Sequence, residues 1–391
     1  MESKLKEILQ YMDEHKADML QDYKTLVNMK DFWKDAADVN AVGQWLKKAF
    51  EQEGFHCQLI DVGDKAGKLL VGLLGSERPG KPVMFCGHMD TALDSFLYKD
   101  DPFYIEDGKA YGPGVLDMKG GILISLYTVK ALNAAGWQGR PIKILYASDE
   151  EGFHDRSHCE NRMIKESKGL LMAFNMETGL MDKALCIGRK GRLGLDVIVD
   201  GVSAHSGNDF TAGINAIEEM AHKIIDFQGL TDLEVGTTVS VGTIKGGTIA
   251  NAIPAQCVLS VDVRFKTMAE GDRVKQLLQR VCKKTYIAGT KTQAAITGEM
   301  APYETTDGVM KLYDFVRSTV SNYGFGDISC RAVGGSSDAA YVTMAGTPIL
   351  CSCGAIGEWN HTTKEYVLVD SLFERVGMFA AVIMESDHFA L

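Results

Sequence analysis

Hydrophobic residues in the first half of the chain form short, nearly continuous runs, and loops rich in glycine and acidic residues follow them. The runs occupy residues 68–75, 82–90, 141–151 and 170–178. Runs of this length are typical of central strands that are covered on both faces of an α/β sheet. Residues 2–25, 38–53 and 121–136 have the periodicity of helices. We therefore predict an α/β domain.

The pattern changes after about residue 190. The predicted elements are, in order, a strand at 192–200, a helix at 213–225, two strands of alternating character around 237–244 and 257–265, a helix at 270–286 and a strand at 292–299. This β-α-β-β-α-β order is that of a ferredoxin-like unit. The last part of the chain again contains a helix, a strand and a helix. We predict a discontinuous first domain, 1–189 and 303–391, with an inserted α+β domain over 190–302.

Composition and charge narrow the class of protein. The 391 residues are 46% hydrophobic and 24% charged, which is the profile of a globular protein with room for two domains. The net charge of −11 argues against nucleic acid as a partner, because phosphate binding requires a basic face. No apolar stretch is as long as a membrane span, and the first helix is charged and amphipathic, unlike a signal peptide. We expect a cytoplasmic protein that binds neither nucleic acid nor a membrane.

The nine cysteines are irregularly spaced, which favours free buried thiols over disulfides. Cys351 and Cys353 resemble half of a metal site, but no second pair of cysteine or histidine ligands occurs at zinc-finger spacing. We therefore expect no zinc finger.

Polar residues follow the predicted strands at the points where the strands end, and further ones occur in two loops. They are His88, Asp90, Asp117, Glu150, Glu151, Glu177 and His361. Any one of them has an ordinary explanation as a solvated acid or a surface histidine. Sites in open α/β sheets gather at the carboxyl ends of the strands, so joint placement is informative. Two histidines and several carboxylates are the ligands that zinc or a similar ion prefers.

Two pairs within this set have more than one interpretation. His88 and Asp90 lie two positions apart, so in an extended segment their side chains face the same side. They could be two metal ligands, a catalytic dyad or ordinary loop residues. Glu150 and Glu151 are adjacent, so their side chains diverge and are expected to differ in role. If Glu151 is a ligand, Glu150 faces the metals as a base; the alternative is two exposed acids before a helix.

Five motifs occur in the order found in a known family. They are G-H-M-D-T (87–91), G-P-G-V-L-D-M-K-G-G (112–121), D-E-E (149–151), M-E-T (176–178) and N-H-T-T-K-E (360–365). In these motifs the chain resembles the co-catalytic di-zinc exopeptidases and deacylases, which include glutamate carboxypeptidase, succinyl-diaminopimelate desuccinylase, acetylornithine deacetylase, peptidase T and aminoacylase. The resemblance covers nearly the whole chain and implies a zinc-exopeptidase-like catalytic domain over 1–189 and 303–391, with a mixed sheet flanked by helices. It also implies that the inserted ferredoxin-like domain, 190–302, is a lid and dimerisation domain. Five ordered motifs are far more specific than any single one.

The resemblance implies two divalent metal ions per chain. Zinc is the expected metal, and the ligands are also compatible with cobalt or manganese. His88 and Glu177 would hold one ion, Glu151 and His361 the other, and Asp117 would bridge them. A bridging carboxylate places two metals about 3.5–4 Å apart. In the family the peptide bond after this aspartate is cis.

The resemblance also implies catalytic roles around the metals. Metal-bound water would be the nucleophile, and Glu150 would be the general base that takes its proton and passes it to the leaving amine. Asp90 then fits better as the carboxylate that accepts the imidazole N–H of His88 and orients the ring than as a ligand.

Residues of the inserted domain would complete the site. The match of G-V-S-A-H-S-G implies that His205 reaches an active site across a dimer interface and stabilises the oxyanion. Asn251 and Arg264 match positions that bind the substrate's carboxylate, for which a guanidinium is well shaped. Gly335 and Ser336 lie in a substrate-contacting turn, G-G-S-S-D. The alternative for His205 is an ordinary loop histidine, and the alternative for Arg264 is a solvent-facing charge on a strand. We expect a homodimer through the lid.

The chain departs from the family after D-E-E, where the family has a Gly-Ser turn. Here the sequence is G-F-H-D-R-S-H-C-E-N, in which His154, His158 and Cys159 look like additional ligands. The residues above already fill two metal sites. We therefore interpret these three as loop residues beside the substrate entrance.

The sequence thus favours a two-metal hydrolase that cleaves an amide bond next to a free carboxylate in a small peptide or acyl-amino-acid substrate, of the carboxypeptidase or dipeptidase type. An N-acyl amino acid deacylase shares every catalytic residue and is the alternative. A non-catalytic, metal-stabilised binding module is the third hypothesis. Glu150 and His205 favour an enzyme, because a structural metal site needs no additional base.

Overall fold

The computed structural model describes residues 2–391, which divide into two compact units. The first unit ends at Gly188 and includes Thr305–Ala332 and Asp338–Leu391, whereas the second consists of Arg189–Glu304 and Val333–Ser337. The sequence places the whole of 303–391 in the first domain, and the structure differs there. Val333–Ser337 belongs to the second unit, where the Ser336 hydroxyl donates to the carbonyl of Lys190 over 3.1 Å.

The main sheet of the first unit is mixed, as predicted. Its strands, in spatial order, are β1 (His56–Ile60), β2 (Leu69–Leu74), β6 (Ile142–Ala147), β3 (Val83–His88), β7 (Met172–Asn175) and β14 (Ile349–Leu350). Strands β6, β3, β7 and β14 are parallel, and β2 and β1 continue the sheet in antiparallel fashion. Strand β3 is buried along its whole length, which explains its continuous hydrophobic run.

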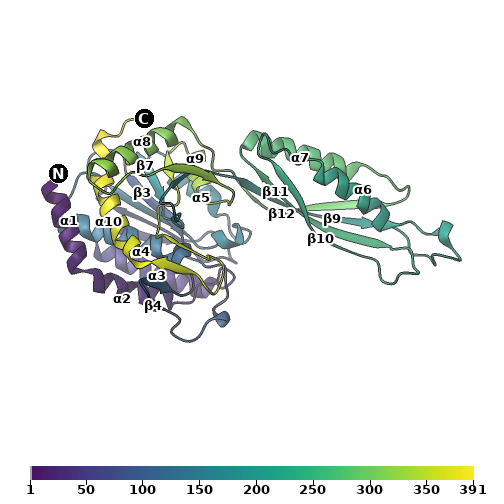
Figure 1. The fold of residues 1–391 in the computed structure, drawn as a ribbon, viewed down its shortest axis with the longest axis horizontal. Helices are drawn as coiled ribbons and strands as arrows, with labels where there is room; N and C mark the ends of the chain where they lie inside the picture. Colours follow the sequence, from purple (N-terminus) through teal and green to yellow (C-terminus); the bar gives the residue numbers. More distant parts are fainter. Residues whose placement is uncertain (1) are drawn as a thin grey trace. The chain divides into compact units, whose positions relative to one another are not determined.

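Helices lie on both sides of this sheet (Figure 1). They are α1 (Glu2–Glu14), α2 (Lys16–Val27), α3 (Ala36–Gln52), α4 (Gly120–Ala134), α5 (Cys159–Glu166), α8 (Asp307–Asn322), α9 (Ala339–Met344) and α10 (Val369–Met384). Helix α3 packs on β1 and β2, α5 on β6, and α8 and α9 on β14, while α4 and α10 pack together. The continuous helix predicted over 2–25 is wrong, because the chain leaves helical geometry at His15, with φ −114° and ψ 16°.

Smaller strands complete the first unit. A four-stranded antiparallel sheet has the order β15 (Gly357–Glu358), β16 (Tyr366–Leu368), β5 (Lys109–Tyr111) and β4 (Tyr104–Glu106). The strands β8 (Leu185–Arg189) and β13 (Cys330–Val333) form a separate pair. The small sheet matters for the site, since the β15–β16 connection carries His361 and the chain runs from β5 into the segment of Asp117.

The second unit has the predicted ferredoxin-like order of elements. These are β9 (Gly191–Asp200), α6 (Ala216–Gln228), β10 (Thr238–Gly246), β11 (Gln256–Phe265), α7 (Met268–Lys283) and β12 (Lys291–Met300). The strands form an antiparallel sheet in the order β10-β11-β9-β12. Alternate strand residues such as Leu193, Val197 and Leu259 join Met220 and Leu278 of the helices in one core. Alternation arises because only one face of the sheet is covered by helices.

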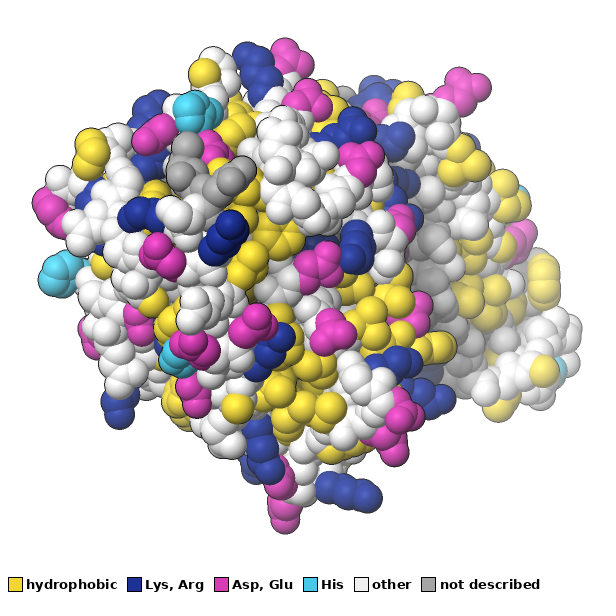
Figure 2. Space-filling model, turned by 60° about the vertical axis from the view of Figure 1, so that its left-hand side comes forward, with side chains coloured by type: hydrophobic (Ala, Val, Ile, Leu, Met, Phe, Trp, Pro, Cys, Tyr) yellow, Lys and Arg dark blue, Asp and Glu magenta, His cyan; other side chains and the backbone are white. Residues whose placement is uncertain are grey.

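The surface carries charges of both signs. On the face that Figure 2 shows, lysine and arginine side chains are scattered among aspartate and glutamate and form no large basic patch. Within residues 2–391, no helix combines the length and apolar character that crossing a membrane requires. The nine cysteines are free thiols, seven of them buried.

Candidate metal centre

Three parallel strands bring the predicted ligands to one edge of the main sheet. His88 is the last residue of β3, which lies between β6 and β7. It is opposite Ala147 at the end of β6, three residues before Glu150. Glu177 follows two residues after β7 ends. Side chains from distant parts of the sequence therefore meet where parallel strands end together.

Asp117 reaches this edge from the turn before α4. Gly114 has a φ of +66°, a left-handed conformation that glycine adopts without strain, and a Cβ there would lie 2.5 Å from Thr91 Cγ2. The peptide bond between Asp117 and Met118 is cis, as the family resemblance implies. The local sequence, glycine before the turn and glycine after it, permits this close packing.

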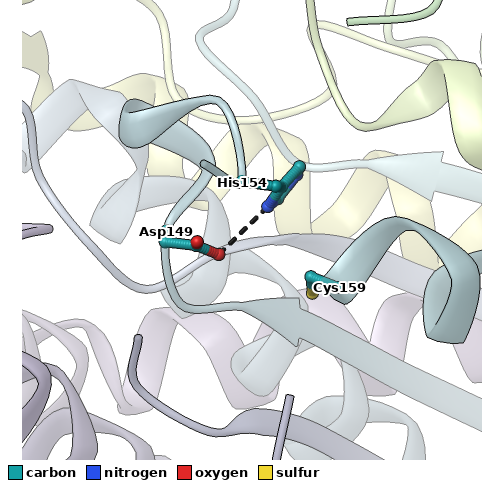
Figure 3. Close-up of side chains that lie close together, drawn as sticks. All are labelled: Asp149, His154 and Cys159. Atoms are coloured by element: carbon teal, nitrogen blue, oxygen red, sulfur yellow. Dashed lines mark hydrogen bonds and ion pairs between the residues drawn. The ribbon is translucent and has the colours of Figure 1, made fainter. Parts of the chain in front are cut away.

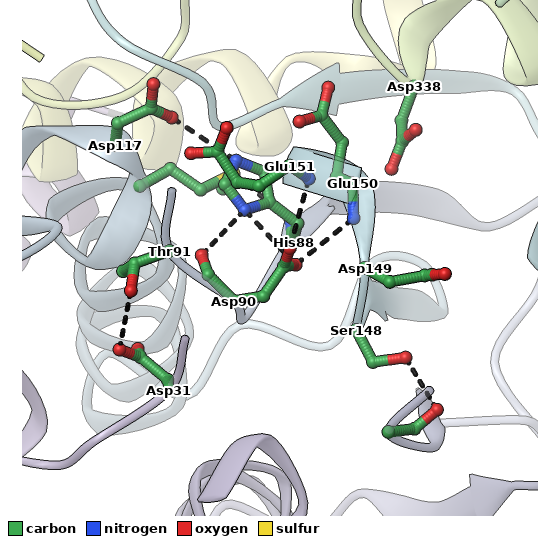
Figure 4. Close-up of polar contacts among 12 residues, drawn as sticks. Asp31, His88, Asp90, Thr91, Asp117, Ser148, Asp149, Glu150, Glu151 and Asp338 are labelled. Carbon is green, nitrogen blue, oxygen red and sulfur yellow. Dashed lines mark hydrogen bonds and ion pairs between the residues drawn. The ribbon is translucent and has the colours of Figure 1, made fainter. Parts of the chain in front are cut away.

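The two oxygens of Asp117 face two separate groups of side chains. Its Oδ1 lies 3.2 Å from His88 Nε2, which is itself 3.5 Å from Glu177 Oε1. Its Oδ2 lies 3.2 Å from His361 Nε2, which is 3.2 Å from Glu151 Oε2. Figure 4 shows Asp117, Glu150 and Glu151 gathered around His88. The structure therefore brings all five predicted ligands together.

The donor set fits two divalent cations that share Asp117. Within each group the possible ligand atoms lie within 4.8 Å of one another. Nitrogen and oxygen ligands bind zinc at about 2.0–2.2 Å, so neighbouring ligand atoms around one ion are expected about 3.3 Å apart. The other oxygen of Glu151, Oε1, is buried and has no hydrogen-bond partner among the described residues. An unpaired buried carboxylate oxygen at this place is what a bound cation would explain.

The negative charge of the buried carboxylates in this cluster also favours the binding of cations. Burial would lower the pKa of His88, but the surrounding carboxylates outweigh it and raise that pKa well above its ordinary value. Hydrogen bonds to Asp117 and Glu151 raise the pKa of His361 to about 11. Burial raises the pKa of Glu150 well above its usual range, and Glu177 adds to this effect while His88 opposes it. The carboxylates therefore hold the histidines as cations unless other positive charge is present.

Asp90 does more than the sequence predicts. Its backbone carbonyl, at 3.0 Å, is closer to His88 Nδ1 than its carboxylate, at 3.5 Å. The carboxylate accepts the backbone N–H groups of Glu150, over 3.3 Å, and Glu151, over 3.0 Å. The predicted contact with the imidazole is thus shared with the carbonyl. The carboxylate mainly fixes the turn that carries the two glutamates.

Glu365 is a site residue that sequence reasoning missed. It is buried, and its Oε1 accepts the backbone N–H groups of Leu116, over 2.7 Å, and Asp117, over 2.9 Å. Burial raises its pKa to about 8, and the charge of Asp117 adds to this. The signal was present, because the motif N-H-T-T-K-E ends in this residue.

Replacing Glu365 with alanine is expected to loosen the turn that carries Asp117. Two buried N–H groups would lose their acceptor, which destabilises the fold by about 1–3 kcal/mol for each. Loss of such a supporting contact lowers metal affinity about 10- to 100-fold in comparable sites. Zinc titration and thermal unfolding measure both effects. Glu365→Gln keeps an oxygen acceptor and should recover most of the loss; equal zinc affinity in Glu365→Ala and the unmodified protein would contradict the role.

The predicted lid residues lie in the second unit. His205 and Asn251 are exposed and lie on neighbouring loops, since Ser206 N donates to Asn251 O over 3.0 Å. Arg264 donates from Nε to Asp262 Oδ1 over 2.7 Å, and its Nη1 is 3.5 Å from Ser336 Oγ. Gly335 is exposed beside Ser336. The structure therefore pairs His205 with Asn251, and Arg264 with Ser336.

These two pairs lie at opposite ends of the same sheet. Arg264 is opposite Arg192 near the start of β9, whereas His205 follows the end of β9 at Asp200. Eight strand residues at about 3.3 Å each separate the ends by about 26 Å. Asn251 and Arg264 of one chain cannot both contact one small carboxylate. The sequence pattern does not reveal this separation.

The additional histidines and cysteine are placed differently from the prediction. His154 and Cys159 are buried, so neither lies beside a substrate entrance; His158 is exposed. The ring of His154 lies between two aspartates. Sequence alone shows only a loop here, because the partners of His154 are distant along the chain or hidden in the D-E-E motif.

The sequence is similar to those of known amide hydrolases. Residues 187–290 match the model of the peptidase dimerisation domain. Over 374 residues the chain is 28% identical to carboxypeptidase G2 of Pseudomonas sp. (strain RS-16), which covers 94% of this chain and 89% of that protein. It is 24% identical over 360 residues to succinyl-diaminopimelate desuccinylase of Caulobacter sp. (strain K31), with coverages of 86% and 89%.

Solved structures share the fold. The aminopeptidase PepT from Bacillus cereus matches with a TM-score of 0.78 and 19% identity, over 95% of this chain and 99% of that one. An M20 family metallo-carboxypeptidase from Sulfolobus solfataricus matches with a TM-score of 0.74 and 17% identity, over 93% and 98%. Together these similarities confirm the resemblance drawn from the motifs: over most of its length the chain is similar to a carboxypeptidase and to desuccinylases, and residues 187–290 match the peptidase dimerisation domain.

Proposed function

We propose that the protein is a two-metal hydrolase that cleaves an amide bond next to a free carboxylate, in the manner of a carboxypeptidase or dipeptidase. One observation carries the proposal. Asp117 directs its two oxygens toward two separate groups of ligand type, while buried Glu150, next to Glu151 and near His88 in Figure 4, belongs to neither group. A purely structural metal site would not need this additional carboxylate.

Within this proposal each residue has a defined task. His88 and Glu177 would hold one ion, Glu151 and His361 the second, and Asp117 both. When bound, two divalent cations, zinc first among the candidates, supply positive charge that polarises the amide carbonyl and lowers the pKa of water.

Glu150 would receive a proton from the attacking water on its carboxylate and deliver it to the leaving nitrogen. Burial raises the pKa of Glu150 and so strengthens its carboxylate as a base, while nearby positive charge, such as that of His88, favours the ionised form that accepts the proton. The carboxylate of Asp90 holds the backbone N–H groups of Glu150 and Glu151, so the base keeps its direction toward the metal site.

Residues of the second unit would bind the substrate. The guanidinium of Arg264 is oriented by Asp262 and accompanied by Ser336, an arrangement that suits a planar carboxylate. Gly335, in the same turn as Ser336, would allow the substrate to approach the backbone. His205 and Asn251 would contact the reacting carbonyl and the carboxylate from the partner subunit of a homodimer.

The separation of these pairs along the sheet leads to a testable dimer prediction. Because His205 lies far from Arg264 in its own chain, we expect a homodimer in sedimentation experiments and low activity in His205→Gln. Mixing His205→Gln with Glu150→Gln and allowing subunits to exchange should restore activity, because a mixed dimer has one complete site. A fully active monomer, or no recovery in verified mixed dimers, would rule out the contribution across the interface.

A deacylase that removes an acyl group from an amino acid is the second candidate, and the similarity to a desuccinylase favours it. The zinc- or cobalt-loaded protein should be assayed with dipeptides and acyl-glutamates against N-acetyl and other N-acyl amino acids. We expect dipeptides or acyl-glutamates to be hydrolysed fastest. Faster cleavage of N-acyl amino acids would favour the deacylase, and no hydrolysis would favour a metal-stabilised binding module.

A further inference from the structure

A second buried polar cluster lies beside the metal centre, and the proposed mechanism does not use it. His154 Nδ1 is 3.0 Å from Asp149 Oδ1, and His154 Nε2 is 2.7 Å from Asp338 Oδ1. Figure 3 shows the contact with Asp149. All three side chains have no solvent exposure. Since an ionised carboxylate only accepts hydrogen bonds, a histidine with one at each ring nitrogen donates from both and is a cation.

The cation compensates two buried negative charges. Burial would lower the pKa of His154, but Asp338 and Asp149 outweigh it and raise that pKa well above its ordinary value. Asp149 Oδ1 also accepts the hydroxyl of Ser157 over 2.9 Å. The second oxygens of both aspartates are buried and have no hydrogen-bond partner among the described residues. Without His154, two carboxylates would be left close together in the interior, which is strongly unfavourable.

The cluster joins two functional segments of the chain. Asp149 directly precedes Glu150, and Figure 4 shows Asp338 near both. Asp338 directly precedes α9 and is the residue at which the chain returns to the first unit after 333–337. Ser336 lies two residues earlier. His154 therefore connects the turn of the proposed general base with the end of the proposed substrate-contacting turn.

A third metal site is the obvious alternative. Asp149, His154 and Cys159 have ligand atoms within 4.8 Å of one another, and these are donor types that zinc accepts. His154 Nδ1 lies 3.0 Å from Asp149 Oδ1 and Nε2 lies 2.7 Å from Asp338 Oδ1, closer than the roughly 3.3 Å expected between neighbouring ligand atoms of one ion, whereas both histidines of the metal centre lie 3.2 Å from Asp117. A metal ligand would need one nitrogen free of a proton and directed at the ion. The geometry therefore favours an ion-paired cluster over a metal site.

We propose that His154 is a positioning residue that holds Asp149 to Asp338 and thereby keeps Glu150 directed at the metal centre. The inference rests on the proposed function of Glu150. Asp90 fixes the backbone of the same turn through the N–H groups of Glu150 and Glu151. His154 fixes the turn through the preceding side chain. Displacing a reacting group by about 1 Å lowers an enzymatic rate about 100-fold.

The test compares His154→Gln and Asp338→Asn with His158→Gln, a matched control in the same loop whose side chain is exposed. Backbone hydrogen exchange at Glu150 and Glu151, metal content, thermal unfolding, kcat and KM are measured for each zinc-loaded protein. For the two cluster variants we expect faster exchange at these amides and a kcat about 100-fold lower. We expect KM and metal content to stay close to those of the control.

Other outcomes are equally decisive. Exchange and kcat equal to those of His158→Gln in a folded His154→Gln or Asp338→Asn protein would overturn the positioning role. If the unmodified protein binds a third metal ion that His154→Gln loses, the cluster is a metal site and the positioning role is wrong. If His154→Gln does not fold, Asp338→Asn, which preserves side-chain volume, decides by the same measurements. If the unmodified protein hydrolyses no amide, the proposed function fails, while the exchange data still decide whether His154 holds the turn.

Discussion

Glu150→Gln is expected to lose most of the hydrolytic rate and to keep its metal ions. The amide has nearly the shape of the carboxylate but cannot accept and return a proton, and general acid–base catalysis contributes about 10²- to 10⁴-fold to such rates. Glu150 belongs to neither group of ligand atoms, so metal binding should be nearly unaffected. The drop should appear in kcat, because the lost interaction acts in the reaction step.

The neighbouring substitution Glu151→Gln is the matched comparison. It changes the adjacent residue in the same way, but Glu151 Oε2 lies 3.2 Å from His361 Nε2 within a ligand group. We therefore expect Glu151→Gln to lose metal as well as activity. Steady-state kinetics together with metal analysis separate the two cases. A fully active Glu150→Gln protein would show that Glu150 is not the base.

Asp117→Ala is expected to reduce metal content and to abolish hydrolysis. Asp117 is the one residue that both ligand groups share, so its removal leaves each group with two of its three members. The loss also leaves the histidines and remaining carboxylates without the central charge that orders them. Because both ions depend on the same carboxylate, affinity for both should fall.

Metal analysis after gel filtration without free zinc measures this effect. Asp64→Ala, at an exposed position outside both ligand groups, is the control and should retain about two ions per chain. Thermal unfolding shows whether Asp117→Ala remains folded in the absence of metal. Retention of two ions by a folded Asp117→Ala protein would contradict the bridging role.

Much of the metal centre could be predicted because its residues follow continuous hydrophobic runs. His88 and Glu177 come at or just after strands whose burial imposes such runs, and parallel strands end at the same edge. The alternating strands of the second unit were equally visible, since one face of the sheet packs on helices. Roles within the motifs, by contrast, came from resemblance to a family and not from these patterns.

The contacts of the supporting residues could not be predicted from local pattern, although Glu365 itself lies in the motif N-H-T-T-K-E. Glu365 contacts backbone N–H groups 248 and 249 positions away, and His154 meets Asp338 184 positions away. A sequence motif records side chains, so it does not show which backbone N–H groups a buried carboxylate contacts. A buried histidine between two aspartates looks, in sequence, like any polar loop.

Chain geometry accounts for the other differences. No glycine or proline marks the end of α1 near His15, so the amphipathic pattern continues through the break. The return of 333–337 to the second unit depends on hydrogen bonds such as that from Ser336 to Lys190. The distance between Asn251 and Arg264 depends on strand register, which the pattern of hydrophobic residues leaves open.

The central claim, hydrolysis that requires two metal ions, is tested most directly by titrating the metal-free protein with zinc while following cleavage of a dipeptide or acyl-glutamate. We expect no cleavage without metal and full activity at about two ions per chain. Full activity in the presence of a strong chelator, or binding of two ions without cleavage of any amide substrate, would contradict it.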